Sequence, residues 1–439
     1  MQEPTLLYSY ILSQDKIFLL RRITMQIKLK NAKCLIDGNI SSRDIYINEG
    51  KASFAPMGEE VLCEFDNCIF TPGFLDVHVH LREPGFSMKE RVATGTAAAA
   101  RGGYTDVCSM PNLNPVPDTP ETLQKQLDII DKDALIGVHP YGSITMMEAG
   151  EQLADLEGMA DKVCGFSDDG RGVQSDEMMR AAMIKAKSLG KIIAAHCEDN
   201  SLLFGGYINE CAYQRVHGHK GISNASEWKQ IERDLKLVEE TGCDYHVCHI
   251  STKESVDLIR KAKAKGLPVT CETGPHYLVL CDGDLQEDAR FKMNPPLRSR
   301  EDMMALREGI LDGTIDMIAT DHAPHTLEEK SQGLAKSPMG ITGIETAFPI
   351  MYTELVKPGI ITMEKLLELM VTNPRKRFGI PASEDSFSVL STERKYKIDP
   401  NSFLSMGKST PFAGKEVYGE CLMTVINRRI VWQSSMTER

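Results

Sequence analysis

The central part of this 439-residue chain alternates short apolar runs with longer amphipathic segments. Eight of the apolar runs have the length and composition of strands, at residues 74–79, 105–110, 134–139, 162–167, 192–197, 245–250, 267–272 and 315–320. Helix start signals stand between some of them, at Asn224-x-x-Glu227, Ser251-x-x-Glu254 and Ser299-x-x-Asp302. Eight strands that alternate with helices predict an α/β fold, a (β/α)8 TIM-type barrel of parallel strands.

The two ends of the chain have a different pattern. In residues 25–70 and again in residues 412–434, apolar and polar residues alternate, which is typical of a half-buried antiparallel sheet. Neither stretch is long enough to form a stable sheet alone. We therefore expect a small β-sandwich domain formed by both chain ends, residues 25–70 and 385–439, next to a barrel domain of residues 71–384.

Residues 1–24 precede the first expected strand, which starts at Met25. A secretory signal would place its charges first and a small-residue cleavage site last, and this segment does neither. We expect residues 1–24 to be a disordered N-terminal extension.

Charge and cysteine content restrict the partners and the compartment. The 62 acidic and 50 basic residues give a formal net charge of −12, which disfavours nucleic acid or an anionic membrane as a partner. A small anionic substrate remains compatible with this charge. No apolar run approaches the ~18 residues of a membrane span. The 12 cysteines include no CxxC pair, which favours reduced thiols in a cytoplasmic protein over a disulfide framework.

Histidine or aspartate residues stand at the C-terminal ends of five expected strands. They are His78 and His80 on the first strand, Asp168 and Asp169 on the fourth, His196 on the fifth, His249 on the sixth and Asp321 on the eighth. These strand ends converge on one mouth of such a barrel, where catalytic groups lie. Four imidazoles and two carboxylates exceed the needs of one tetrahedral ion and match two divalent ions that share a carboxylate. Nitrogen and oxygen ligands favour zinc, with manganese or cobalt as alternatives.

A series of short motifs runs through the chain in a fixed order. It consists of PGFLDVHVHLREPG (72–85), MPN (110–112), FSDDG (166–170), HCEDN (196–200), CHIST (248–252), MNPPLR (293–298), TDHAPH (320–325) and GKSTPFAGKEVYG (407–419). The first motif resembles the opening metal motif of the amidohydrolase superfamily, and the whole series resembles the class I bacterial dihydroorotases over about residues 25–434. The resemblance implies a hydrolase acting on cyclic amides, which interconverts N-carbamoyl-L-aspartate and L-dihydroorotate in de novo pyrimidine (UMP) biosynthesis.

The same resemblance implies two Zn²⁺ ions per subunit and a role for each candidate ligand. His78, His80 and Asp321 would hold the first ion, His196 and His249 the second, and Asp169 would bridge them. We choose Asp169 over Asp168 because its spacing to His196 matches the family. A hydroxide between the ions would attack the ring amide carbonyl, with Asp321 as the general base and then the general acid.

The resemblance also implies the substrate contacts. The substrate-binding residues would be His80, Arg82, Asn112, Asn294, His325, Met339 and Gly340. Arg82, Asn112 and His325 would bind the substrate carboxylate, and Asn294 the ring amide. Many relatives carry Phe where this chain has Met339, which favours a backbone contact there. The polar segment 326–338 that follows is expected to form a mobile lid.

Three other functions compete with this interpretation. Hydantoinases and dihydropyrimidinases carry a carboxylated lysine at the end of the fourth strand, where this chain has Asp168 and Asp169, while Lys162 lies at the start of that strand. An allantoinase-like cyclic amide hydrolase would share the metals, but Arg82 and Asn112 favour a substrate with a carboxylate. A non-catalytic scaffold for aspartate transcarbamoylase would lack metal ligands, and all six are present.

The remaining expectations concern partners and other histidines. The resemblance implies a homodimer and allows an association with aspartate transcarbamoylase. His276 is expected to support the site and His322 to lie beside it. The other histidines are expected to be structural or solvated, and they are His139, His217, His219 and His246.

Overall fold

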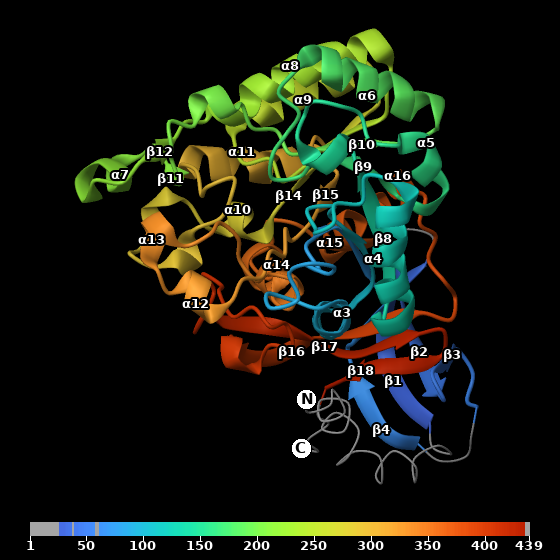
Figure 1. Cartoon of the computed structure of the whole chain (residues 1–439). Helices are drawn as coiled ribbons and strands as arrows, with labels where there is room; N and C mark the ends of the chain where they lie inside the picture. The colour runs from blue at the N-terminus through green and yellow to red at the C-terminus, as the bar shows by residue number, and fades with distance from the viewer. Residues whose placement is uncertain (1–25, 37–38, 58–60, 435–439) are drawn as a thin grey trace, which may run out of the picture.

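The computed structural model describes residues 26–36, 39–57 and 61–434, so the extension expected over residues 1–24 lies outside the described residues. Two large sheets dominate the fold (Figure 1). One is a ring of parallel strands at the centre, and the other joins the two ends of the chain.

The central ring contains eight strands in the order of the sequence, and neighbouring strands are parallel. They are β6 (Phe74–Val79), β7 (Tyr104–Ser109), β8 (Gly137–Ser143), β9 (Gly165–Ser167), β10 (Ile193–Ala195), β13 (Tyr245–Val247), β14 (Val269–Thr273) and β15 (Met317–Ile318). Each one overlaps a predicted run. The largest shift is in β8, which ends at Ser143 rather than at residue 139. The predicted (β/α)8 barrel is confirmed.

The first and last strands of the ring meet at their C-terminal ends. Val79 forms a parallel bridge with His322, and the backbone N–H of His80 donates to the carbonyl of His322 at 2.9 Å. This closure brings the loop after β6 against the loop after β15. The predicted residues on these two strands therefore become spatial neighbours.

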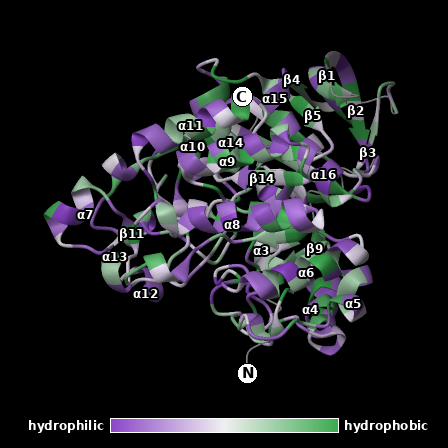
Figure 2. Cartoon of the chain, turned by 90° about the horizontal axis from the view of Figure 1, so that it is seen from above, coloured by the Kyte–Doolittle hydropathy of each residue, from purple (hydrophilic) through white to green (hydrophobic). Residues whose placement is uncertain are grey.

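Helices cover the outside of the ring (Figure 1). The main ones are α3 (Val92–Gly102), α4 (Pro120–Asp133), α5 (Leu156–Met159), α6 (Asp176–Ser188), α8 (Ala225–Thr241), α9 (Lys253–Ala264), α11 (Arg300–Leu311), α14 (Ala347–Met351), α15 (Met363–Leu367) and α16 (Asn373–Phe378). Shorter elements emerge at the mouth, namely β11 (Ile208–Asn209), α7 (Ala212–His217), β12 (Gly221–Ile222), α10 (Pro275–Val279), α12 (Leu327–Lys330) and α13 (Gly333–Lys336). Helix α8 buries Ile231, Leu235, Leu237 and Val238, and Figure 2 shows that hydrophilic and hydrophobic residues alternate along it.

Side-chain caps fix where two of these helices begin. Ser299 caps α11, as predicted. Asn224 stands at the predicted start of α8, but its side chain forms no cap hydrogen bond. Helix α9 is capped by Thr252, one residue later than the predicted Ser251. The backbone N–H groups of Ser251 and Thr252 donate to the buried carboxylate of Glu227 on α8, at 2.9 and 3.1 Å. The backbone N–H of Ser251, which the predicted capping box would pair with Glu254, therefore binds Glu227 of the neighbouring helix instead.

The second sheet confirms that both chain ends form one β-structure. Its strands are β1 (Gln26–Ile36), β2 (Asn39–Asn48), β3 (Lys51–Ser53), β4 (Val61–Asp66), β5 (Ile69–Thr71), β16 (Phe387–Lys397), β17 (Glu416–Ile426) and β18 (Arg429–Gln433). Strand β16, which was not predicted as a separate strand, pairs with both β5 and β17 and so joins the two ends. Leu29 and Ile45 share a hydrophobic core with Val389 and Val425.

Two further expectations concern the whole chain. Every cysteine whose side chain the structure describes is a free thiol. Within the described ranges, no helix has the length and apolar character that crossing a membrane requires.

Candidate metal centre and substrate pocket

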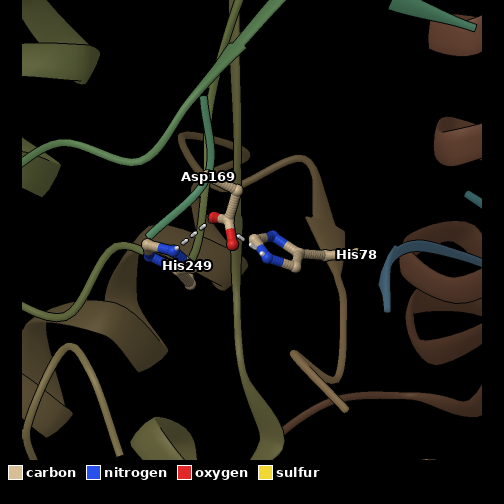
Figure 3. Close-up of side chains that lie close together, drawn as sticks. All are labelled: His78, Asp169 and His249. Carbon is tan, nitrogen blue, oxygen red and sulfur yellow. Dashed lines mark ion pairs between the residues drawn. The ribbon is translucent and has the colours of Figure 1, made fainter. Parts of the chain in front are cut away.

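Six predicted side chains from five strand ends form one cluster, with the carboxylate of Asp169 at its centre. Its Oδ1 lies 3.3 Å from His78 Nε2, 3.6 Å from His249 Nε2 and 3.7 Å from His196 Nδ1. Figure 3 shows this carboxylate between the rings of His78 and His249. On the other side, His80 Nε2 lies 3.5 Å from Asp169 Oδ2.

Asp321 closes the cluster from the eighth strand. Its Oδ1 lies 3.0 Å from His80 Nε2 and 3.6 Å from His78 Nε2. Its backbone has a φ of 46°, and that of His249 a φ of 33°. Residues other than glycine rarely adopt this left-handed conformation, and where they do the strain is concentrated at functional sites. The fold therefore imposes an unfavourable backbone at two of the six positions to bring these side chains inward.

The cluster fits divalent metal ions. The ligand-type atoms of His78, Asp169 and His249 lie within 4.8 Å of one another, and so do those of His78, His80 and Asp321. His78 Nε2 and Asp169 Oδ1 are buried and have no hydrogen-bond partner among the described residues. Buried polar atoms without partners are rare and point to a missing ion or water. Imidazole nitrogens and carboxylate oxygens are ligands that zinc accepts.

A carboxylate from the seventh strand supports the cluster from behind, and the sequence analysis did not identify it. Glu272 Oε1 lies 2.6 Å from His78 Nδ1 and accepts from the backbone N–H of His249 at 3.2 Å. Its Oε2 lies 3.0 Å from His246 Nε2. Such a carboxylate orients a metal-binding histidine and makes it a better donor. Its position was a signal that could have identified it. Glu272 ends the expected strand 267–272, and the expected strands on either side of it each have a predicted metal ligand at their C-terminal end.

Cys248 belongs to a third group of ligand-type atoms, with His78 and Glu272. Burial raises the pKa of the Cys248 thiol to about 12, and the charge of Glu272 adds to this effect. The thiol is therefore protonated and is a poor ligand in this state. Glu272 also already binds the Nδ1 of His78, which leaves the groups around Asp169 and Asp321 as the better metal sites.

The two neighbouring aspartates after β9 point to different places. Asp168 Oδ1 accepts from the backbone N–H groups of Ile144 and Thr145 at 2.8 and 3.1 Å, and its other oxygen accepts from the Thr145 hydroxyl. Its hydrogen bonds fix the loop after β8. Asp169 alone of the two faces the histidines.

Neighbouring charges within the cluster favour a negative Asp169 and a positive His78. Burial opposes ionisation of Asp169, but His78 and His249 outweigh it and hold the pKa of the Asp169 carboxyl well below its usual range. Burial likewise opposes protonation of His78, but Asp169 and Glu272 raise its pKa well above the usual value. The pocket is thus built to hold positive charge next to Asp169.

Arg82 lies beside this cluster as a cation without an ion pair. Its backbone has a φ of 62°, and its Nε donates to the carbonyl of Pro324 at 3.3 Å. Among the described residues no carboxylate lies within 4.0 Å of its guanidinium nitrogens. Burial lowers the pKa of Arg82 to about 10, although Asp321 and Asp169 oppose the shift. A charged guanidinium that the protein leaves free can bind an anionic substrate.

The two predicted asparagines touch the metal cluster as well as the pocket. Asn112 Oδ1 lies 2.8 Å from His80 Nδ1, and its Nδ2 donates to Asp169 Oδ2 at 3.2 Å. Asn294 Nδ2 lies 3.5 Å from His196 Nε2, while its Oδ1 is buried and without a hydrogen-bond partner among the described residues. Asn112 therefore orients cluster residues, and Asn294 keeps an acceptor for another group.

The remaining predicted substrate residues form one wall. His325 Nε2 lies 2.8 Å from the carbonyl of Met339, and its Nδ1 lies 3.3 Å from Lys89 Nζ. Burial, together with Arg82 and Lys89, lowers the pKa of His325 to about 3, so that its ring is neutral. Gly340 has a φ of 129°, and a Cβ there would lie 2.7 Å from the carbonyl oxygen of Ala323.

The other histidines behave largely as expected. His139 pairs with Asp106 at 3.1 Å, and His219 pairs with Glu287 at 2.6 Å. His246 is more closely involved than expected, because it shares Glu272 with His78. Two more lie near the cluster: His276 is buried, and His322 accepts from the backbone N–H of Gly343 at 3.3 Å.

Comparisons with known proteins agree with this geometry. A family described as "Dihydro-orotase-like" matches residues 68–255. A dihydroorotase of Fusobacterium nucleatum subsp. nucleatum is 50% identical over 415 residues, which cover 92% of this chain and 98% of the relative. A dihydroorotase of Bacillus cytotoxicus is 46% identical over 423 residues, or 93% and 99% of the two chains.

Solved structures with the same fold include an L-hydantoinase (dihydropyrimidinase) from Arthrobacter aurescens. It is 26% identical, with a TM-score of 0.81 over 93% of this chain and 96% of the other. A dihydropyrimidinase from Brevibacillus agri has a TM-score of 0.78 at 21% identity, over 93% and 95% of the two chains. At this level the second likeness concerns the fold alone.

Proposed function

The chain belongs to the dihydroorotase family, and on that premise we propose how its residues carry out the reversible conversion of N-carbamoyl-L-aspartate to L-dihydroorotate. The enzyme is a hydrolase acting on a cyclic amide and serves pyrimidine biosynthesis. The observation that carries the proposal is the meeting of four histidines and Asp321 around Asp169, with the unpaired Arg82 beside them.

The proposed metal centre would hold two Zn²⁺ ions. His78, His80 and Asp321 would hold the first ion, His196 and His249 would hold the second, and Asp169 would be shared by both. When bound, such ions polarise a carbonyl group and make water a nucleophile at neutral pH. Orphaned atoms of His78 and Asp169 in the cluster support this assignment. Metal analysis of the purified protein tests it, and fewer than two ions per chain at full activity would contradict it.

Asp321 moves the proton in the proposed reaction. In hydrolysis of dihydroorotate, its carboxylate takes a proton from the attacking water and delivers it to the ring nitrogen when the amide bond breaks. In ring closure, the proton moves in the opposite direction. Burial raises the pKa of the Asp321 carboxyl, but His80 and His78 outweigh it and lower that pKa below the usual value. Asp321 is therefore ionised at neutral pH and free to accept a proton. The strained backbone of Asp321 supports a catalytic role for this position.

The substrate carboxylate binds to Arg82, assisted by Asn112 and His325. The ring amide is held by Asn294 and by the backbone of Met339 and Gly340, and His80 also contacts the substrate. The absence of a carboxylate partner for Arg82 within the described ranges supports this orientation. The buried acceptor of Asn294 suits an amide N–H of the ring.

A single assay separates this function from its rivals. Hydrolysis by purified, metal-loaded protein is measured with dihydroorotate, allantoin and hydantoin at equal concentration, and ring closure with N-carbamoyl-L-aspartate. We expect turnover of dihydroorotate to exceed that of both neutral rings by at least two orders of magnitude, because they lack the carboxylate that Arg82 binds. Faster hydrolysis of allantoin or hydantoin would overturn the substrate assignment.

The compartment, the oligomeric state and the partner enzyme are separate proposals. Free cysteines throughout the described ranges support a cytoplasmic enzyme. A homodimer remains a prediction that light scattering checks. An association with aspartate transcarbamoylase remains one that co-purification from the native cell checks. We also propose that the ring of strands and the sheet from the chain ends form the two domains predicted, with boundaries near residues 70 and 385.

A further inference from the structure

A half-buried lysine on helix α12 joins the segments that line the proposed substrate pocket. The ammonium group of Lys330 donates to the carbonyl oxygens of Lys292, Pro338 and Gly340, at 3.2, 3.0 and 2.8 Å. The backbone N–H of Gly340 donates to the carbonyl of Lys292 at 3.1 Å and so links the same two segments. One side chain therefore connects three points of the chain around the pocket.

These three carbonyls stand next to the proposed substrate contacts. Lys292 is two residues before Asn294, and Pro338 and Gly340 lie on either side of Met339. A shift of either segment would move an amide that contacts the ring. Lys330 does not itself reach the metal cluster, since its hydrogen bonds all go to the backbone carbonyls named above.

The ammonium group of Lys330 forms hydrogen bonds here but no ion pair among the described residues. No carboxylate in the described part of the chain lies within 4.0 Å of its ammonium group. An ammonium that leaves water is unfavourable unless hydrogen bonds and charges compensate it. Burial and the nearby charge of Lys292 together lower the pKa of Lys330 to about 7, against the opposing charges of Asp288 and Glu329. Near neutral pH the side chain therefore carries a partial positive charge beside a pocket proposed to bind an anion.

Helix α12 is also bound to the loop after β6. Lys89, in the loop after β6, forms an ion pair of 3.0 Å with Glu329 and lies 3.3 Å from His325 Nδ1. Leu334 of the following helix, α13, is buried. Figure 2 places α12 and α13 on the side of the barrel away from strands β1–β3. The segment 326–338 therefore contacts the barrel at several residues. Among them, Lys330 binds the backbone that is proposed to hold the substrate ring.

We propose that Lys330 is a positioning residue for the cyclic substrate, which holds the backbone at 338–340 and at 292–294 in the arrangement that binds the ring amide. This role rests on the proposed function, because it assigns the ring to these two segments. The same side chain, when protonated, adds positive charge beside these two segments. Lys330 thereby acts on substrate binding more than on the bond-breaking step.

The test compares four proteins in metal-loaded form. Lys330→Met removes the charge and all donors at similar volume, Lys330→Arg keeps both, and Lys336→Met is the matched control on an exposed lysine of the same segment. We measure KM and kcat with dihydroorotate, and amide hydrogen exchange of residues 339–341 without substrate. For Lys330→Met we expect KM to rise about 10-fold or more, kcat to fall less than KM rises, and exchange to accelerate about 10-fold.

The outcomes separate this inference from the proposed function. Recovery of part of the lost affinity in Lys330→Arg supports positioning by a cationic donor. Equal KM in Lys330→Met and Lys336→Met would overturn it, and so would faster exchange with unchanged KM, because Lys330 would then be only structural. If the unaltered protein does not turn over dihydroorotate, the proposed function is wrong. Hydrogen exchange does not depend on that activity, so equal exchange in Lys330→Met and the unaltered protein would separately show that Lys330 does not order these segments. If Lys330→Met does not fold, Lys330→Gln gives the same comparison with one donor group retained.

Discussion

His78 Nε2 and Asp169 Oδ1 face each other at 3.3 Å, and neither atom has a hydrogen-bond partner among the described residues. Glu272 lies 2.6 Å from the other nitrogen of His78. Although burial lowers the pKa of His78, the negative charges of Asp169 and Glu272 raise it well above the usual value. Positive charge is therefore favoured at Nε2, next to the carboxylate oxygen of Asp169. A metal ion held there would supply this charge in place of a proton, which is why this pair is the strongest argument for metal at this position.

The first prediction concerns the support behind His78. Glu272→Gln removes the charge that orients His78 and keeps the size of the side chain. We expect metal affinity to fall about 10–100-fold, as for other carboxylates that hold a metal-binding histidine. Competition with a chelator measures it. The exposed Glu384 provides the control variant Glu384→Gln, and equal affinities of the two variants would refute the role of Glu272.

Asp321→Asn tests proton transfer. The amide cannot accept the proton of the attacking water, so we expect kcat to fall about 1,000-fold, within the range of general acid–base catalysis. The metal content of the variant, measured in parallel, separates loss of a proton carrier from loss of an ion. Turnover close to that of the unaltered protein would remove Asp321 from the reaction.

Arg82 is predicted to determine the preference for a carboxylate. Arg82→Met should raise KM for dihydroorotate about 10–100-fold, since a charge-assisted pair is lost, with a smaller change in kcat. Arg82→Lys keeps the charge without the paired donors and should lie in between. The control is Arg300→Met on the exposed start of α11. An unchanged KM in Arg82→Met would place the carboxylate elsewhere.

Gly340 is predicted to be intolerant of a side chain for reasons of space and of conformation. In Gly340→Ala the new Cβ would lie 2.7 Å from the carbonyl of Ala323 and 3.1 Å from His325 Nε2. We expect KM to rise about 10-fold or more as this wall moves. Gly333→Ala is the matched control, since its φ is also positive but no atom lies within 4 Å of its Cβ. Similar kinetics of the two variants would mean that the contact at Gly340 is harmless.

The pH dependence of stability should reveal the buried charge of Lys330. Its pKa is about 7 in the folded protein and near 10.5 when unfolded, so the unfolded chain binds more protons between these values. The unfavourable contribution is complete below pH 7 and disappears as the pH rises toward 10.5. From pH 7 to pH 9 we expect the unaltered protein to gain about 2 kcal/mol relative to Lys330→Met. Urea unfolding of both proteins at both pH values measures this, and a constant difference would contradict it.

Much of the barrel and the composition of the site followed from local sequence patterns. Strands β6, β10 and β13 are short runs whose residues are buried on both faces, and their largely apolar pattern can be recognised without the rest of the chain. Strand ends are likewise a local property, so His78, His196 and His249 were assigned to one mouth as soon as a barrel was inferred. The joining of both chain ends in one sheet also follows, because neither end can bury its apolar face alone.

The tertiary structure determined the orientation of individual side chains and the contacts between residues that are far apart in the sequence. Asp168 and Asp169 are adjacent in sequence, and only the hydrogen bonds from Thr145 show which one turns away from the histidines. Glu272 was overlooked because its role exists only through contacts with His78 and His246 on other strands. The cap of α9 shifted to Thr252 for the same reason, since Glu227 comes from another helix. Sequence patterns carry the periodicity of an element, whereas the orientation of a single polar group is set by the neighbours that the closed barrel brings within hydrogen-bond distance.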